Sequence, residues 1–152
     1  MVRAYFNPKG LAIIISSPSG AGKSTITRSL LDSDKRLSMS VSYTTRPRRD
    51  KEVDGRDYHF VTEEQFFQML DQGEFLEYAQ IFGNHYATSE TQTKEMMRAG
   101  KDVIFDVDWQ GQQAITRRLP KEQTVSVYIL PPSLNELKTR LEKRAQDSPS
   151  SL

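Results

Sequence analysis

Near the start of the chain, a run of small residues with one lysine follows a short apolar segment. Residues 11–15 are Leu-Ala-Ile-Ile-Ile, and residues 16–25 read SSPSGAGKST. Small side chains let successive backbone N–H groups converge on a phosphate, while Lys23 adds a positive charge and the Ser24 hydroxyl can bind Mg²⁺. The order of strand, loop and helix signals predicts a nucleotide-phosphate site. The alternative is an ordinary small polar turn, and Ser17 stands where the usual GxxxxGK[ST] pattern begins with glycine.

Two carboxylates follow the apolar segment 103–105. Asp106 comes at the expected carboxyl end of this strand, where enzymes that act on nucleoside triphosphates place a residue that orients hydrated magnesium. Asp108 would point the same way in an extended segment, so one carboxylate can serve the metal and the other an acceptor nucleoside. The alternative is a solvated pair of acids at a strand end.

A basic cluster occupies residues 42–49, which read SYTTRPRR. Arg46 and Arg49 lie three positions apart on an expected irregular loop, so their guanidinium groups could converge on one phosphate, with a tyrosine hydroxyl as a neutral donor. Basic runs are more often solvated surface, and a contact with a nucleic-acid backbone would also fit this pattern.

Composition narrows the class of protein. The chain has 152 residues, a formal net charge of +1 and no cysteine, which is typical of one globular domain and excludes disulfides and thiolate metal sites. The nearly neutral charge argues against a general polyanion-binding surface, so we expect no nucleic-acid partner. The apolar run after Arg3 is too short for a signal peptide and no other run could span a bilayer, so we expect a cytoplasmic protein without a membrane partner.

Apolar periodicity predicts the elements that position these groups. Strands are expected at 11–15, 102–106 and 124–130, alternating with helices at 24–31, 89–98, 110–119 and 134–144. The pattern changes between 39 and 88, where short strands are expected at 40–43, 57–61, 75–81 and 85–87, with one helix opened by a capping box of Thr62 and Gln65. The sequence therefore predicts an α/β fold with a parallel core sheet (1–38 and 89–132), an inserted substrate-binding subdomain (39–88) and a further segment at 133–152.

Five segments, in this order and spacing, resemble guanylate kinases over residues 10–148. They are SPSGAGKST, SVSYTTRPRRDKEVDGRDYHFV, FLEYAQIFGNHYATS, VIFDVDWQG and ILPPSLNELKTRLEKR. The resemblance implies a P-loop NTPase fold with three layers, a GMP-binding subdomain and a mobile lid that begins near residue 133. It also implies Mg²⁺-dependent transfer of the terminal phosphoryl group of ATP to GMP, which gives ADP and GDP.

The resemblance also implies a role for each site residue. The ATP-binding loop is Ser19, Gly20, Ala21, Gly22, Lys23, Ser24 and Thr25, with Mg²⁺ held by Ser24 and, through water, by Asp106. Arg46, Arg49, Tyr58 and Tyr86 would bind the GMP phosphate, although the family usually has Arg-x-Pro-Arg where this chain has Arg-Pro-Arg-Arg. The guanine would be read by Ser42, Glu77, Thr88 and Asp108, and the residues that act on the transferred group would be Lys23, Arg46, Arg49, Arg140 and Arg144.

Physical chemistry supports the guanine-reading role. A carboxylate at Glu77 can accept hydrogen bonds from guanine N1–H and from the exocyclic amine, whereas adenine would leave it unpaired, so discrimination on the order of 10⁴ is expected. Without the resemblance, Glu77 would be read as an outward-facing strand residue, and Tyr58 and Tyr86 as half-buried sheet aromatics. Similarly, Arg140 and Arg144 could simply solubilise a helix whose apolar stripe is Leu134, Leu137 and Leu141.

The resemblance stops near Ser148, where the family would continue with a further arginine, a long helix, a last core strand and a closing helix. We therefore expect a truncated guanylate kinase that binds GMP but is impaired in phosphoryl transfer, with self-association as one way to cover the exposed side of the sheet. A non-catalytic protein-binding module of this family is the first alternative, but such modules typically have a degraded phosphate loop. A kinase of a phosphorylated ribose is the second, but it should lack Glu77 and the two clamp arginines. A GTPase is disfavoured because no Asn-Lys-x-Asp motif occurs.

Overall fold

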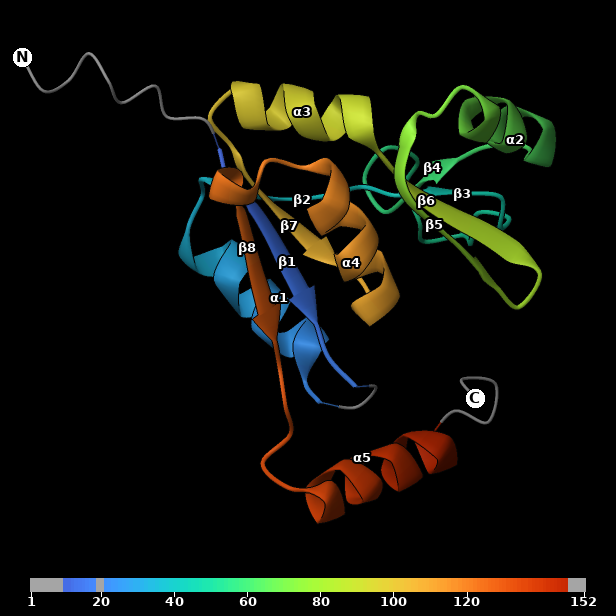
Figure 1. The fold of residues 1–152 in the computed structure, drawn as a ribbon. Helices are drawn as coiled ribbons and strands as arrows, with labels where there is room; N and C mark the ends of the chain where they lie inside the picture. The colour runs from blue at the N-terminus through green and yellow to red at the C-terminus, as the bar shows by residue number, and fades with distance from the viewer. Residues whose placement is uncertain (1–9, 19–20, 148–152) are drawn as a thin grey trace, which may run out of the picture.

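Four parallel strands form the core sheet, in the order β2-β7-β1-β8 (Figure 1). The computed structural model describes residues 10–18 and 21–147. The strands are β1 (Ala12–Ser16), β2 (Leu37–Met39), β7 (Asp102–Asp106) and β8 (Thr124–Tyr128). Ala12 and Ile14 in β1 and Val103 in β7 are completely buried, as expected for strands of a parallel sheet covered on both faces. The predicted parallel α/β core is thus confirmed.

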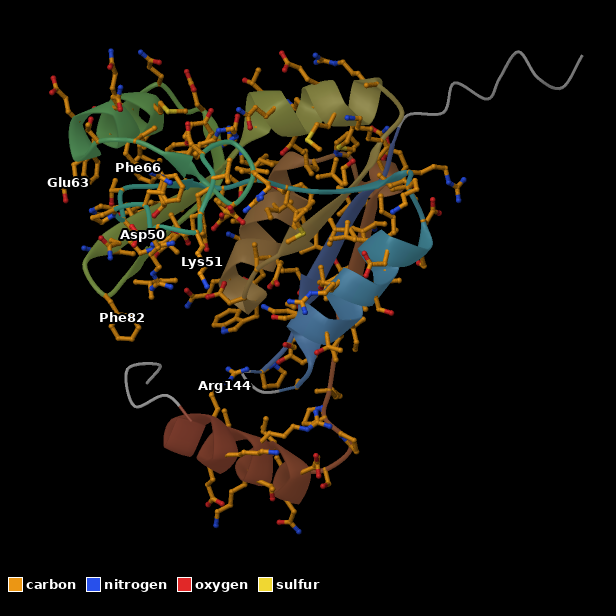
Figure 2. All side chains as sticks on the ribbon, turned by 180° about the vertical axis from the view of Figure 1, so that it is seen from behind. Asp50, Lys51, Glu63, Phe66, Phe82 and Arg144 are labelled. Carbon is orange, nitrogen blue, oxygen red and sulfur yellow. The ribbon has the colours of Figure 1, made fainter. Side chains whose placement is uncertain are left out.

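Helices cover both faces of this sheet. The helices are α1 (Lys23–Ser33), α3 (Glu90–Arg98) and α4 (Trp109–Arg118), with a 3-10 turn, η2, at Lys121–Gln123. Met97 of α3 and Ile115 of α4 join the same apolar cluster as Ile14 and Phe105. The two views place α1 on the opposite face of the sheet (Figures 1 and 2). None of the helices in the described ranges is long and apolar enough to cross a membrane.

A second, mixed sheet lies beside the core, in the order β4-β3-β6-β5. Its elements are β3 (Tyr43–Thr44), β4 (His59–Phe60), α2 (Glu63–Asp71), β5 (Phe75–Ile81) and β6 (Asn84–Ser89). Phe66 of α2 is completely buried against Phe75 and Ala87 of the sheet. The predicted capping box of α2 is confirmed, because the Thr62 hydroxyl accepts from the Gln65 N–H while the Gln65 side chain accepts from the Thr62 N–H.

Several contacts join this second sheet to the core. Leu76 of β5 is buried in the core cluster with Ile115 of α4. Arg118, at the end of α4, donates to the carbonyl oxygens of Gly73 and Phe75 and pairs with Glu90 at the start of α3. The strand that carries Glu77 is therefore anchored directly to a helix of the core.

The segment after α1 differs from the prediction. One strand was expected at 40–43, but the structure has β2 at Leu37–Met39 and β3 at Tyr43–Thr44. β2 pairs with β7 in the core sheet, while β3 pairs with β4 and β6 in the second sheet. Each strand is only two or three residues long, so its existence depends on the partner strands and not on a local alternation of apolar and polar residues.

The last described helix, α5 (Leu134–Asp147), extends away from the core sheet (Figure 1). Its start agrees with the prediction, since the Ser133 hydroxyl accepts from the Glu136 N–H. The expected apolar stripe is largely uncovered by the described residues, with 82% of Leu134 and 39% of Leu141 exposed. β8 forms one edge of the core sheet among the described strands, and Val125, Val127 and Tyr128 on it are also exposed.

Candidate nucleotide site

The predicted phosphate-binding loop lies between the carboxyl end of β1 and the start of α1. Gly22 precedes the helix with a φ of 91°, a left-handed conformation that favours glycine. The first N–H groups of α1 have no partner within the helix, which makes its N-terminus suitable for an anion. A cavity of about 440 Å³ opens here, lined by Ser17, Pro18, Ala21, Gly22, Lys23, Ser24, Thr25, Asp106, Asp108 and Arg144. The predicted residues Ser19 and Gly20 lie outside the described ranges.

Lys23 and Asp106 line this cavity and contact each other. The Lys23 Nζ lies 2.6 Å from the Asp106 Oδ1 and 3.4 Å from the Val107 carbonyl oxygen. The register of the sheet explains the contact, since Ile15 near the end of β1 lies beside Asp106 at the end of β7. Ser24 lines the same cavity. A hydroxyl and a carboxylate are oxygen ligands of the type that Mg²⁺ prefers, so these residues fit a magnesium site that water and nucleotide phosphates would complete.

A second cavity of about 440 Å³ lies between the core and the second sheet. Its lining includes the predicted residues Ser42, Tyr58, Glu77, Tyr86 and Asp108, but not Thr88, Arg46 or Arg49. The rest of the lining is Lys23 at the start of α1, Asp106 at the end of β7, Val107, and Ala79 and Ile81 of β5. Lys23, Asp106 and Asp108 line both cavities. The structure therefore brings the predicted donor and acceptor sites together at these three residues.

Glu77 is held on the wall of the second cavity by its neighbour across the sheet. The register of β5 and β6 places Glu77 opposite Thr88, and the Thr88 hydroxyl donates to the Glu77 Oε1 at 2.8 Å. Burial raises the pKa of Glu77 above its usual value, the Thr88 hydrogen bond opposes this rise, and the charge of Asp108 adds to it. The hydrogen bond from Thr88 thus fixes the position of the Glu77 carboxylate, whose second oxygen can accept from a ligand.

Asp108 has a structural contact as well as a place on the cavity. Its Oδ1 accepts from the Gly111 N–H at 2.8 Å and caps α4. A Cβ at position 111 would lie 3.0 Å from the Val107 Cβ, so a side chain there would require a shift of a few tenths of an ångström. The cap fixes the direction of a carboxylate that also faces both cavities.

Arg46 is bound by a residue that sequence reasoning did not single out. Its guanidinium group forms two hydrogen bonds with the carboxylate of Glu52, at 2.6 and 3.1 Å. The guanidinium carbon lies 5.4 Å from the ring centre of Tyr58, and the Tyr58 ring lies 5.9 Å from that of Tyr86. The hydrogen bond to Glu52 is the main cause that raises the pKa of Arg46, and the Tyr86 hydroxyl contributes to the rise. Three of the four predicted phosphate ligands therefore lie together.

The fourth predicted phosphate ligand, Arg49, has an exposed side chain. Its backbone N–H donates to the Glu52 Oε2 at 2.8 Å. The structure therefore ties the backbone of Arg49 to the carboxylate that holds Arg46. The convergence of the two guanidinium groups on one phosphate stays a prediction. No periodic pattern marks Glu52, and the only signal in the sequence is an acidic residue within a basic loop.

The two arginines of α5 lie across a cavity from the phosphate loop. Arg140 and Arg144 line a space of about 490 Å³ with Ala21, Gly22, Thr25 and Ile26. Arg144 also lines the first cavity, and Figure 2 shows this side chain projecting from α5. Arg140 donates to the Glu136 carboxylate at 2.8 Å. The helix thus brings positive charge to the side of the loop where a nucleotide phosphate would lie.

Comparison with known proteins decides the family. The sequence model of the family described as Guanylate kinase matches residues 9–152. The chain belongs to this family. It is 53% identical over 140 residues to the guanylate kinase of Paramagnetospirillum magneticum and 50% identical to that of Agrobacterium fabrum, in each case over 92% of this chain. It spans 65% and 63% of the lengths of these relatives.

Structural comparison agrees with the sequence match. A crystal structure of guanylate kinase from Anaplasma phagocytophilum is similar with a TM-score of 0.69 and 33% identity, and the match covers 95% of this chain and 72% of that one. These findings do not favour the ribose-phosphate kinase or the non-catalytic module for this member of the guanylate kinase family.

Proposed function

We propose that this chain contains the ATP and GMP sites of a guanylate kinase, which transfers the terminal phosphoryl group of ATP to GMP in the presence of Mg²⁺. The main support for this function comes from two cavities, one at the phosphate loop and one at the second sheet. Both are lined by Lys23, Asp106 and Asp108. A phosphoryl donor in the first cavity and an acceptor in the second would face each other there. This is the arrangement that transfer by positioning requires.

On the donor side, the loop and the N-terminus of α1 would bind the ATP phosphates through backbone N–H groups. Lys23 would exchange its contact with Asp106 for the phosphates, because its Nζ already lies at the junction of the two cavities. Ser24 and Asp106 would hold Mg²⁺, the latter through water. When bound, the metal would neutralise part of the charge on the transferring group.

On the acceptor side, Arg46, Arg49, Tyr58 and Tyr86 would bind the GMP phosphate, whose oxygen is the nucleophile. Glu77 would accept from guanine N1–H and the exocyclic amine, and Ser42, Thr88 and Asp108 would support the base. No covalent enzyme intermediate is required, so the protein has to align the two substrates and neutralise their charge. Arg140 and Arg144 of α5 would add positive charge around the transferred group.

A direct assay tests this function. Purified protein would be incubated with ATP, Mg²⁺ and one nucleoside monophosphate at a time, and the diphosphate products followed by ³¹P NMR. We expect GDP from GMP and no diphosphate product from AMP beyond background. A Lys23→Ala variant purified in the same way controls for kinases of the expression host. GDP formation no faster than in that control, by a folded protein, would contradict the transfer step.

A further inference from the structure

We propose that Glu52 is a positioning residue of the acceptor-phosphate site, which holds Arg46 and its loop ready for the phosphate of GMP. The inference rests on the proposed function and assigns Glu52 a role in GMP binding. Its starting point is that Glu52 is the carboxylate that contacts the predicted phosphate clamp.

The ion pair between Arg46 and Glu52 is bidentate and largely enclosed. Arg46 Nη2 lies 2.6 Å from Glu52 Oε1, and Nη1 lies 3.1 Å from Oε2. The exposed fractions of the two side chains are 13% and 18%, whereas those of the surface pair between Arg36 and Asp34 are 80% and 33%. An enclosed, planar contact of this type restricts the guanidinium group far more than a surface ion pair does.

Aromatic rings restrict the same guanidinium group from another side. Its carbon lies 5.4 Å from the ring centre of Tyr58 and 5.9 Å from that of Phe60. Arg46 donates to Glu52 and to the Pro47 carbonyl, and a hydrogen bond with the Tyr86 hydroxyl contributes to its raised pKa. A guanidinium group held in this way beside Tyr58 and Tyr86 is suited to a phosphate.

Glu52 also closes the loop that carries the other arginines. Its Oε2 accepts from the Arg49 N–H at 2.8 Å, and its own N–H donates to the Arg49 carbonyl at 3.0 Å. The Arg48 guanidinium donates to the Glu52 carbonyl at 2.8 Å. One residue therefore contacts all three arginines of the basic cluster and sets the backbone from which Arg46 and Arg49 project.

Glu52 could either position Arg46 for the phosphate or compete with the phosphate for Arg46, and GMP binding separates these two roles. If Glu52 organises the site, its loss lets Arg46 adopt other rotamers. Binding of GMP then has to order the Arg46 side chain at an entropic cost, so GMP binds more weakly. If Glu52 instead only occupies the place of the phosphate, its loss frees Arg46 and GMP binds more tightly. The two roles predict opposite changes in the dissociation constant.

The test is calorimetric titration of wild-type protein and Glu52→Gln with GMP and, separately, with guanosine. We expect the variant to bind GMP roughly tenfold or more weakly, with guanosine binding unchanged, because the effect is confined to the phosphate. Asp34→Asn is the control, since it breaks another bidentate arginine pair that lies in the α1–β2 turn, and it should bind both ligands as the wild type does.

Other results of these titrations would contradict either the proposed function or the positioning role of Glu52. Absence of GMP binding by the folded wild-type protein would contradict the proposed function. Normal GMP binding by the wild type with equal or tighter binding by Glu52→Gln would overturn the positioning role. Glu52→Asp, which keeps the charge but shortens its reach, covers the case in which Glu52→Gln does not fold, and it should also weaken GMP but not guanosine. Unfolding of both variants, or equal loss of both ligands, would assign Glu52 to stability alone.

Discussion

The proposed donor and acceptor halves of the site are built by different means. The donor half consists of a backbone turn and a helix N-terminus at the end of β1, with Lys23 and Asp106 brought together by the register of two adjacent parallel strands. In the acceptor half, side chains hold other side chains, as Glu52 holds Arg46 and Thr88 holds Glu77. We infer that binding of the acceptor is the more sensitive of the two to single side-chain changes and to pH.

Two carboxylates in the acceptor half show the contrast most clearly. The hydrogen bonds from Arg46 and from the Arg49 N–H lower the pKa of Glu52. Burial raises the pKa of Glu77, and the single hydrogen bond from Thr88 only partly opposes it. The causes that shift the pKa of Glu52 include two arginines, whereas those that shift the pKa of Glu77 include no cation. The N–H donors of guanine would stabilise the ionised form of Glu77.

The largest effect is expected on the donor side, from Lys23→Ala. Loss of a charge aimed at the transferring group should lower turnover by about 10² to 10³. The affinity for GMP should change much less, because the phosphate clamp is built from other residues. Steady-state kinetics with GMP titration measure both quantities. Lys35→Ala removes an exposed lysine beyond α1 as a control, and unchanged turnover in Lys23→Ala would remove Lys23 from the mechanism.

Glu77→Gln should have the next largest effect, and it is confined to the acceptor side. Replacing the carboxylate weakens hydrogen bonds worth about 1.5–3 kcal/mol for a charged group, so GMP affinity should fall roughly 10- to 150-fold. The free energy of unfolding without ligand should rise, because a partly buried charge is removed. Calorimetry and urea denaturation measure the two changes, with Glu95→Gln on the exposed side of α3 as the control. Loss of stability with unchanged GMP affinity would assign Glu77 a purely structural role.

The pH dependence should differ between the two carboxylates. In the proposed site, guanine binding requires ionised Glu77. Affinity for guanosine should therefore fall up to tenfold per pH unit below the raised pKa, and this begins at higher pH than for an ordinary glutamate. Guanosine is preferred to GMP here because a phosphate titrates near pH 6. The profile should flatten in Glu77→Gln, and an equally steep fall in that variant would show that another group titrates.

The pKa shifts of Glu77 and Glu52 make the stability of the protein depend on pH in opposite directions. The stability contributed by Glu77 is fully present below its unfolded pKa and is lost as pH rises through the raised folded pKa. The contribution of Glu52 is present above its unfolded pKa and is lost as pH falls through the lowered folded pKa.

The smallest effect is expected from Thr88→Val, which removes the hydroxyl that holds Glu77. The Glu77 carboxylate would lose its hydrogen bond at 2.8 Å, which should raise its pKa further and destabilise the protein by about 1 kcal/mol. GMP affinity should fall by a few fold, which is less than for Glu77→Gln. Thr116→Val removes a hydroxyl that donates to the Gln113 carbonyl on α4 and serves as the control. An effect on GMP as large as that of Glu77→Gln would mean that Thr88 contacts the ligand directly.

Most of the donor half was predictable, because the strand, the loop and the helix are consecutive in the sequence. A strand, a loop of small residues and a helix follow one another, and Asp106 was placed by the rule that parallel strands end at the same edge of a sheet. The position of Glu77 beside the cavity was predicted only through the family resemblance, since its own strand pattern indicated an outward-facing residue.

Other features depend on contacts that no local pattern contains. Glu52 meets Arg46 across an irregular loop, so no period connects them. β2 exists because β7 offers a partner for Leu37–Met39. The apolar stripe of α5 was correctly located in a helix, but periodicity cannot say which element would cover it, and Leu134 remains exposed among the described residues.

The guanine specificity of the second cavity is tested most directly by calorimetric titration of the folded protein with GMP and with AMP. We expect saturable binding of GMP and no detectable binding of AMP at the same concentrations, because only guanine offers two donors to the Glu77 carboxylate. Equal affinity for the two nucleotides, or no binding of GMP, would contradict the claim that the second cavity is a guanine-specific acceptor site.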